Sequence, residues 1–167
     1  MTVRLCTPAD TEALLALFDE ARKTIAALGI DQWQKGYPSR EVVEEDLRAK
    51  RSYLLEQDGD LCGTFVFLTD GEPTYDKIYE GAWHGDENYV ALHRVAVAVK
   101  YRGTGVAETM ISFAAEQAKN GGFSFLRIDT HKGNKVMRRM LEKNGFSPCG
   151  TIYLANGDER IAYDKIL

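Results

Sequence analysis

The feature that most constrains this chain is a β-rich apolar segment, Tyr89–Val99, which passes through a short glycine loop into a helix predicted at Ala107–Lys119. The connecting residues are Lys100-Tyr101-Arg102-Gly103-Thr104-Gly105-Val106. The first backbone N–H groups of a helix have no acceptor within it, and glycines let a ligand approach them closely. Arg102 adds a charge-assisted donor. The segment therefore predicts a phosphate-binding loop.

Two well-known phosphate motifs fit this loop less well. A P-loop has Lys followed by Ser or Thr after its last glycine, whereas this chain has Val106 and Ala107. A dinucleotide fold has a third glycine and an acid about 20 residues later, and Asp129 stands at roughly that place. That alternative stays open, although its motif usually opens a regular parallel βαβ series.

Apolar periodicity and turn residues predict the order of elements along the chain. We expect strands at Val3–Cys6, Tyr53–Gln57, Leu61–Leu68, Tyr89–Val99, Phe125–Thr130, Phe146–Tyr153 and Arg160–Ile166. We expect helices after the caps Thr7 and Ser39, at Ala107–Lys119, and at Asn134–Lys143, with loops at Ile30–Pro38 and Thr69–Asn88. This order predicts an α+β fold in which about four helices flank a mixed sheet of about seven strands.

Length and composition predict a single domain over residues 1–167, because hydrophobic residues make up 44% and charged residues 28% of the chain. The net charge of −4 disfavours nucleic-acid and anionic-membrane partners, which require a cationic face. No apolar run approaches the ~18 residues of a membrane span, and the N-terminus lacks the apolar core of a secretory signal. We therefore expect a cytoplasmic protein, and a homodimer is compatible with this composition.

The cysteines Cys6, Cys62 and Cys149 are odd in number and too widely spaced for a zinc motif. We expect buried thiols, no disulfide framework and no metal. A nucleophilic cysteine would need a neighbouring base, for which the chain offers His84, His93 and His131.

The glycine loop and the last predicted helix resemble the GNAT superfamily of N-acetyltransferases. The family signature is Arg or Gln, two residues, Gly, one residue, then Gly or Ala, and this chain has Arg102, Gly105 and Ala107. A second family block resembles residues 134–146, which begin with asparagine and end in Glu-Lys-x-Gly-Phe. The predicted order of elements also matches the family over essentially the whole chain.

The resemblance implies that acetyl-coenzyme A, the acyl donor, binds in a cleft where two central strands splay apart. Cofactor contacts are then expected from Val95, Val97, Arg102, Gly103, Thr104, Gly105, Val106, Ala107, Asn134, Met137 and Lys143. It also implies direct attack of an amine on the thioester, with a backbone N–H near Val95 binding the oxyanion.

Two positions depart from the family pattern. Many relatives have a tyrosine acid where this chain has Leu141, and some have a glutamate base where it has Ala91. A thiol with a pKa near ~8.5 is a tolerable leaving group, so water, Tyr153 or Tyr101 is expected to supply the proton.

His93 is the candidate base, acting directly or through water, because some relatives have histidines around this position. Its alternative role is that of a hydrogen-bonded structural histidine. Strand alternation predicts that His93 and Val95 point to the same face, with Arg94 on the other.

The expected substrate-binding residues are Trp33, Tyr37, Trp83 and His131, since the two irregular segments flank the acceptor side in this family. Anchoring of the loops to the core is the alternative role for the aromatic residues. Our hypothesis is an acetyl-coenzyme A dependent N-acetyltransferase acting on a primary amine of a small molecule. The alternatives are a protein or peptide amino-group acetyltransferase, and a noncatalytic sensor that binds an acyl-coenzyme A.

Overall fold

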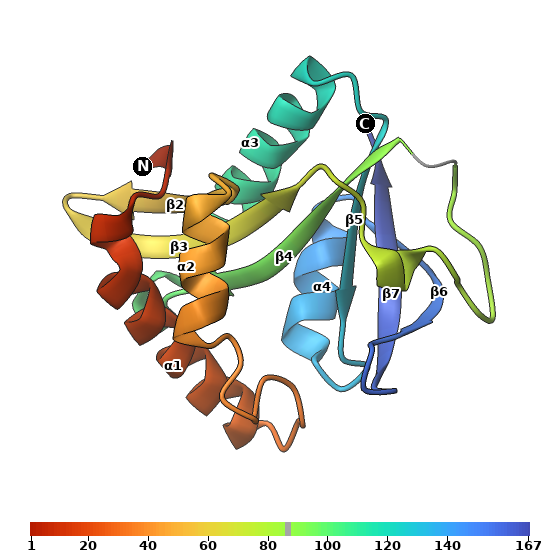
Figure 1. Ribbon diagram of the computed structural model, residues 1–167, viewed down its shortest axis with the longest axis horizontal. Helices are drawn as coiled ribbons and strands as arrows, with labels where there is room; N and C mark the ends of the chain where they lie inside the picture. Colours follow the sequence, from red (N-terminus) through yellow and green to blue (C-terminus); the bar gives the residue numbers. More distant parts are fainter. Residues whose placement is uncertain (86–87) are drawn as a thin grey trace. The chain divides into compact units, whose positions relative to one another are not determined.

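The computed structural model describes residues 1–85 and 88–167, and its elements are labelled in Figure 1. The strands are β1 (Thr2–Leu5), β2 (Ser52–Gln57), β3 (Asp60–Leu68), β4 (Tyr89–Val97), β5 (Phe125–Thr130), β6 (Ser147–Tyr153) and β7 (Glu159–Ile166). The helices are α1 (Thr11–Ala27), α2 (Arg40–Arg48), α3 (Val106–Asn120) and α4 (Lys135–Lys143). The strand order is β1-β2-β3-β4-β5-β7-β6, which confirms the predicted mixed α+β architecture.

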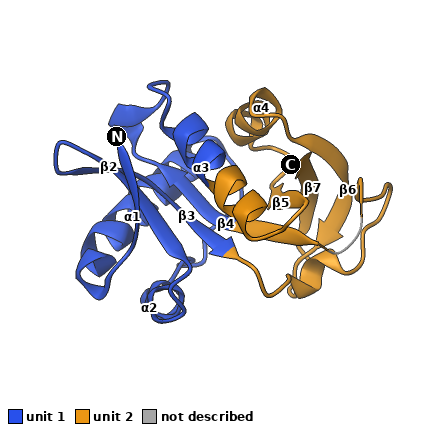
Figure 2. Cartoon of the chain, turned by 90° about the horizontal axis from the view of Figure 1, so that it is seen from above, with its two compact units in different colours: residues 1–67, 93–113 blue, residues 68–92, 114–167 orange. Residues whose placement is uncertain are grey.

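The chain divides into two compact units, coloured separately in Figure 2. Unit 1 comprises residues 1–67 and 93–113, and unit 2 comprises residues 68–92 and 114–167. The strand β4 and the helix α3 each contribute residues to both units. The single-domain assignment stays a prediction.

Unit 1 has helices on both faces of its strands. Leu54 of β2 belongs to a buried cluster with side chains from α1 and α2, which lie side by side in Figure 1. The ring of its neighbour Tyr53 stacks on Phe65 at 5.4 Å and lies 5.5 Å from the ring of Phe113 on α3. Because successive strand residues face opposite sides, α1 and α2 cover one face and the first half of α3 covers the other.

Unit 2 is built around β7, which pairs antiparallel with both β5 and β6. The strand β4 pairs parallel with β5 at three positions. The paired residues are Tyr89 with Phe125, Val90 with Leu126 and Ala91 with Arg127. Ala162 of β7 packs in a buried cluster with Tyr75 from the segment 69–85, whereas the hydroxyl of the adjacent Tyr163 accepts a hydrogen bond from Arg138 of α4. The segment 69–85 and α4 therefore cover opposite faces of this unit's strands.

Short-range sequence signals account for several local features of the backbone. The Ser39 side chain accepts a hydrogen bond from the Val42 N–H at the start of α2. The Asp58-Gly59 turn has positive φ at both residues, as a two-residue hairpin of this kind requires. Asn134 caps α4 through the Met137 N–H. These short-range signals set the helix starts and the β2–β3 register.

Some boundaries differ from the prediction. The strand β4 ends at Val97 instead of Val99, because residues 99–101 form a 3₁₀ turn. The chain after Thr7 begins with a 3₁₀ turn at Pro8–Asp10 before α1 starts at Thr11. Residues 86 and 87 of the predicted loop 69–88 lie outside the described residues. Within the two described ranges, no helix combines the length and the apolar character needed to cross a membrane.

The packing of α3 on β3 depends on the absence of a side chain at Gly63. A Cβ placed there would lie 2.9 Å from Met110 Sδ, 3.0 Å from the Ala96 carbonyl oxygen and 3.0 Å from Val106 Cγ1. Val106 and Met110 occupy the first turns of α3, and both are about 1% exposed. Gly63 thus allows the start of this helix to lie directly on the sheet.

We expect Gly63→Ala to destabilise the protein by about 1–3 kcal/mol, because the added methyl group overpacks this contact. Urea denaturation measures the change. In a Met110→Ala background the same substitution should cost less, since the nearest atom has been removed. An equal cost in both backgrounds would show that Met110 does not limit the space at Gly63.

Candidate functional site

The predicted phosphate loop lies in unit 1, between the end of β4 and the start of α3. Gly103 has a φ of 75° and Gly105 a φ of 89°, a region in which residues with a Cβ are strained. The Gly105 carbonyl accepts a hydrogen bond from the Thr109 N–H at 3.0 Å. Gly105 therefore stands at the cap of α3, and the N–H groups of the first turn follow it.

The loop is open at both glycines. A Cβ placed at Gly103 or at Gly105 would meet no described atom within 4 Å. Arg102 between β4 and the glycines is exposed. An open backbone, the positive end of a helix dipole and one guanidinium together make a suitable cradle for a phosphate group.

The residues before the loop are fixed by acidic side chains of unit 1. The Val99 N–H donates to Glu20 Oε2 at 2.9 Å, and the Tyr101 hydroxyl donates to Asp60 Oδ2 at 2.8 Å. Lys100 forms an ion pair with the same Asp60 carboxylate. The hydrogen bond to Asp60 raises the pKa of Tyr101, which makes this tyrosine a poorer proton donor than an ordinary one.

The backbone of β4 changes at Arg94, whose φ of 50° is unusual for a residue with a side chain. The predicted alternation assumed a regular strand, and that premise is wrong across Arg94. His93, Arg94 and Val95 are all half-buried, as is Val97 near the end of the strand. His93 and Val95 remain candidates, but alternation does not place them on one face.

A buried ion pair accompanies this change of backbone. Arg94 Nε and Nη2 donate to the two carboxylate oxygens of Asp46 on α2, at 2.6 and 2.8 Å. Arg94 Nη1 also donates to the Tyr37 hydroxyl at 2.6 Å. Burial alone would lower the pKa of Arg94, but Tyr37 and Asp46 raise it above its usual value. The sequence analysis missed Asp46, which is one of several charged residues on α2 and has no local sign of a partner on β4.

The predicted substrate residues Trp33 and Tyr37 come together in unit 1. Their ring centroids lie 6.3 Å apart, and the Trp33 ring meets Phe18 of the core edge-on at 5.8 Å. Tyr37 is tied to Arg94, as described above. These contacts show the loop anchoring that we considered as the alternative role, and a role toward a substrate stays a prediction.

In unit 2, His131 and Asn134 shape the turn that leads into α4. The Gly133 N–H donates to His131 Nδ1 at 2.9 Å, and the Asn134 N–H donates to the His131 carbonyl. Asn134 Oδ1 accepts from the Met137 N–H at 3.1 Å. Met137 is half-buried and Lys143, in the last turn, is exposed. The turn therefore has a clear structural function besides any contact with a cofactor.

The tyrosines of unit 2 differ in their access to solvent. Leu141, at the position of the family's usual acid, is fully buried, and so is Tyr163. Tyr153 is 44% exposed, and its ring lies edge-on to Tyr79 at 5.2 Å. Of the two tyrosines considered as proton donors, Tyr101 is bound to Asp60, whereas Tyr153 has an exposed side chain and no acidic partner among the described contacts.

Trp83 anchors the segment 69–85 to the strands of unit 2. Its indole Nε1–H donates to the Tyr75 carbonyl at 3.0 Å, and the Arg127 guanidinium lies 4.3 Å from its ring centroid. The Tyr75 hydroxyl donates to Asp129 at 2.6 Å, and burial with this carboxylate raises the pKa of Tyr75 well above its usual range. Asp129, the acid of the dinucleotide alternative, is therefore engaged with Tyr75 within unit 2.

Comparison with known proteins agrees with the fold and with the family resemblance. The sequence profile described as the acetyltransferase (GNAT) family matches residues 13–146. A crystal structure of a GNAT-family acetyltransferase from Streptococcus agalactiae 2603 is 36% identical and has a TM-score of 0.92, with 99% of this chain and 95% of that chain covered. These matches set aside the dinucleotide alternative.

Two further proteins are more distant. The PaiA N-acetyltransferase of Thermoplasma acidophilum, solved in complex with coenzyme A, is 19% identical to this chain and has a TM-score of 0.76. The match covers 99% of this chain and 98% of that chain, and it shows the fold alone. The chloroplastic GCN5-related N-acetyltransferase 6 of Arabidopsis thaliana is 28% identical over 112 residues, which are 63% of this chain and 38% of that protein. This match thus covers well under half of that relative. From the profile and the Streptococcus agalactiae structure, we conclude that the chain belongs to the acetyltransferase (GNAT) family.

Proposed function

We propose that this protein transfers an acetyl group from acetyl-coenzyme A to a primary amine of a small molecule. The observation that carries the proposal is the open glycine loop at the N-terminus of α3, in a chain of the GNAT family. The loop backbone and Arg102 suit the pyrophosphate of coenzyme A. The backbone of Val95 and Val97 would pair with the amide groups of the pantetheine arm.

The proposed reaction is a direct acyl transfer. The amine nitrogen attacks the thioester carbon, a C–N bond forms and the C–S bond breaks. One amine proton passes to a base, and the sulfur of coenzyme A leaves as a thiol. We assign the oxyanion contact to a backbone N–H near Val95 and the base to His93, directly or through water.

The leaving sulfur of coenzyme A must gain a proton, and several groups could donate it. Leu141 supplies none, and Tyr101 is held by Asp60. We assign the role to Tyr153 because its side chain is exposed, with water as the alternative donor. A thiol of ordinary pKa, ~8.5, departs without strong acid assistance.

A noncatalytic acyl-coenzyme A sensor is the second candidate. The observation that favours it is the burial of both Leu141 and Ala91, which are 0% exposed at the positions where relatives carry an acid or a base. Release of coenzyme A thiol in a screen of amines separates the two functions, because a sensor binds without turnover. Amines on peptides belong in the same screen, since they represent the third hypothesis.

The remaining assignments of the sequence analysis stay predictions. They comprise the cytoplasmic location, the absence of nucleic-acid and membrane partners, the absence of a metal, and the homodimer. Three free cysteines are in keeping with a reducing compartment.

We expect Gly105→Asp to raise the Kd for coenzyme A at least about tenfold, because a carboxylate would face the pyrophosphate at the helix N-terminus. Gly157→Asp is the matched control. Gly157 has a φ of 88°, close to the 89° of Gly105, and a Cβ there also meets no described atom within 4 Å. Calorimetry should find loss of binding in the first variant alone. Equal affinities in two folded variants would refute the proposed loop contact.

Asn134→Ser tests whether this residue serves the cofactor or only the helix. Serine is an equally good cap, so the Tm should change little. The shorter side chain should raise the KM for acetyl-coenzyme A severalfold if Asn134 reaches the cofactor. An unchanged KM with an unchanged Tm would leave capping as its whole function.

His93→Gln tests the proposed base. Glutamine keeps the size and hydrogen-bonding capacity but cannot titrate, so we expect kcat to fall by about 10²-fold with little change in affinity for acetyl-coenzyme A. Steady-state kinetics give kcat and the KM for acetyl-coenzyme A separately. Normal turnover in the variant would exclude His93 as the base.

A further inference from the structure

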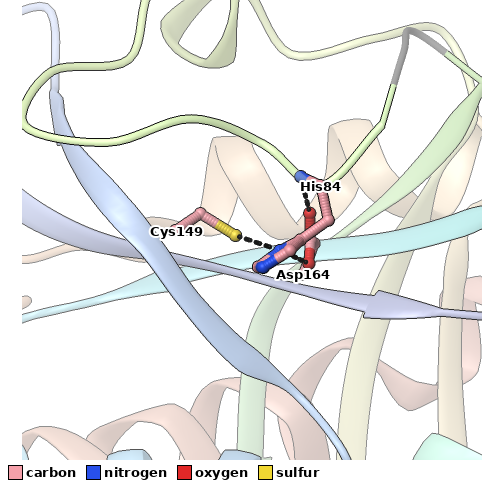
Figure 3. A group of neighbouring side chains, drawn as sticks. All are labelled: His84, Cys149 and Asp164. Atoms are coloured by element: carbon pink, nitrogen blue, oxygen red, sulfur yellow. Dashed lines mark hydrogen bonds and ion pairs between the residues drawn. The ribbon is translucent and has the colours of Figure 1, made fainter.

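Three chemically different side chains converge in unit 2. His84 comes from the segment 69–85, Cys149 from β6 and Asp164 from β7, and Figure 3 shows them pointing toward one another. His84 Nδ1 lies 2.7 Å from Asp164 Oδ1 and 3.4 Å from Cys149 Sγ. All three potential ligand atoms lie within 4.8 Å of one another.

The backbone is built to bring these residues together. The Ala82 N–H donates to the Cys149 carbonyl at 3.0 Å, and Tyr79 forms an antiparallel bridge with Thr151. A Cβ at Gly81 would lie 1.9 Å from the Cys149 carbonyl oxygen, so only glycine allows this approach. The His84 N–H then donates to Asp164 Oδ2 at 2.8 Å. The segment is thus held along β6 with its histidine over Asp164.

This arrangement is not that of a cysteine nucleophile. In a nucleophile–histidine–acid triad, the acid and the nucleophile contact opposite ring nitrogens, whereas Asp164 and Cys149 contact the same one. Burial and the neighbouring Asp164 charge also raise the pKa of the Cys149 thiol to about 12. A thiol of this kind is almost entirely protonated at neutral pH and is a poor nucleophile.

We propose that His84, Cys149 and Asp164 bind one divalent transition-metal ion of the Zn²⁺ class. Imidazole nitrogen, thiolate sulfur and carboxylate oxygen are the ligands that Zn²⁺ takes in proteins, whereas Mg²⁺ and Ca²⁺ favour oxygen alone. The thiolate and the carboxylate together balance the two charges of the ion. A bound metal deprotonates a coordinating thiol outright, so the neutral thiol of the free site does not prevent binding.

The separations of the His84 nitrogen from the other two ligand atoms require only small adjustments. With metal–ligand lengths of about 2.0 Å to nitrogen and oxygen, tetrahedral geometry places those two atoms about 3.3 Å apart. The present separation of 2.7 Å must therefore widen by about 0.6 Å. The sulfur is already at a suitable distance from the nitrogen. Because the His84 side chain is 44% exposed, it leaves an entry path and room for water as the fourth ligand.

The site follows from unit 2 alone and does not depend on the proposed acetyl transfer. A bound ion would connect the segment 69–85 to both β6 and β7 by coordination bonds. Its binding energy would add to the stability of unit 2, because the unfolded chain does not hold the three ligands together. We therefore expect a structural effect that persists in catalytically inactive protein.

The direct test uses tag-free protein, stripped with a chelator and titrated with Co²⁺ as a spectroscopic substitute for Zn²⁺. We expect one ion per chain, with a sulfur-to-metal charge-transfer band in the near ultraviolet and visible bands of tetrahedral intensity. Addition of Zn²⁺ should abolish these bands. Saturation without the sulfur band, or no binding at all, would overturn the proposal and leave a hydrogen-bonded structural cluster.

Variants assign the ligands. Cys149→Ser and His84→Gln keep the size and hydrogen bonding of the site, and each should remove the Co²⁺ charge-transfer band and the rise in Tm caused by Zn²⁺. Cys62→Ser is the matched control, because Cys62 is also buried but lies on β3 in unit 1. It should keep both signals. A Cys149→Ser protein that retains the sulfur band, or a Cys62→Ser protein that loses it, would contradict the assignment.

Discussion

The carboxylate of Asp46 sets the conformation of the strand on which the proposed chemistry depends. It is almost completely buried, and a buried charge without partners would be strongly destabilising. Arg51 Nε donates to one oxygen at 2.8 Å, while Arg94 contacts both oxygens. A planar guanidinium matches a carboxylate in this two-point geometry, which makes the pair directional as well as attractive.

The ion pair offers a physical reason for the left-handed backbone at Arg94. This conformation costs a residue with a Cβ about 1–2 kcal/mol, so something must favour it locally. The charged hydrogen bonds to Asp46 and the bond to Tyr37 provide that preference. The backbone N–H groups that follow Arg94 are those assigned to the oxyanion and the pantetheine arm. The donors at the reacting carbonyl would therefore be held in place by a charge on α2, which itself takes no part in the reaction.

The same network limits what the sequence could reveal. Signals that act over a few residues, such as the Ser39 cap, the Asp58-Gly59 turn and the glycines of the Arg102–Ala107 loop, correctly predicted the elements, whereas phosphate binding by that loop stays a prediction. The pairing of Asp46 with Arg94 joins residues 48 positions apart, and nothing local to either residue marks it. Regular alternation along β4 was the wrong assumption for this reason. His84 lies 65 positions from Cys149 and 80 from Asp164, so the three residues become a group only through the strand pairing of unit 2.

The absence of an acid at Leu141 is compatible with catalysis when the contributions are compared. General acid assistance is worth about 10²–10⁴-fold in rate, and least when the leaving group is already stable. Positioning two substrates in one site contributes about 7–11 kcal/mol, and a preorganised oxyanion donor contributes about 3–4 kcal/mol. We assign both larger contributions to backbone geometry, at the open loop and after Arg94, so neither requires a side chain that protonates the leaving sulfur. The proposed acetyl transfer therefore does not require a tyrosine acid at position 141, provided that the backbone of β4 stays in place.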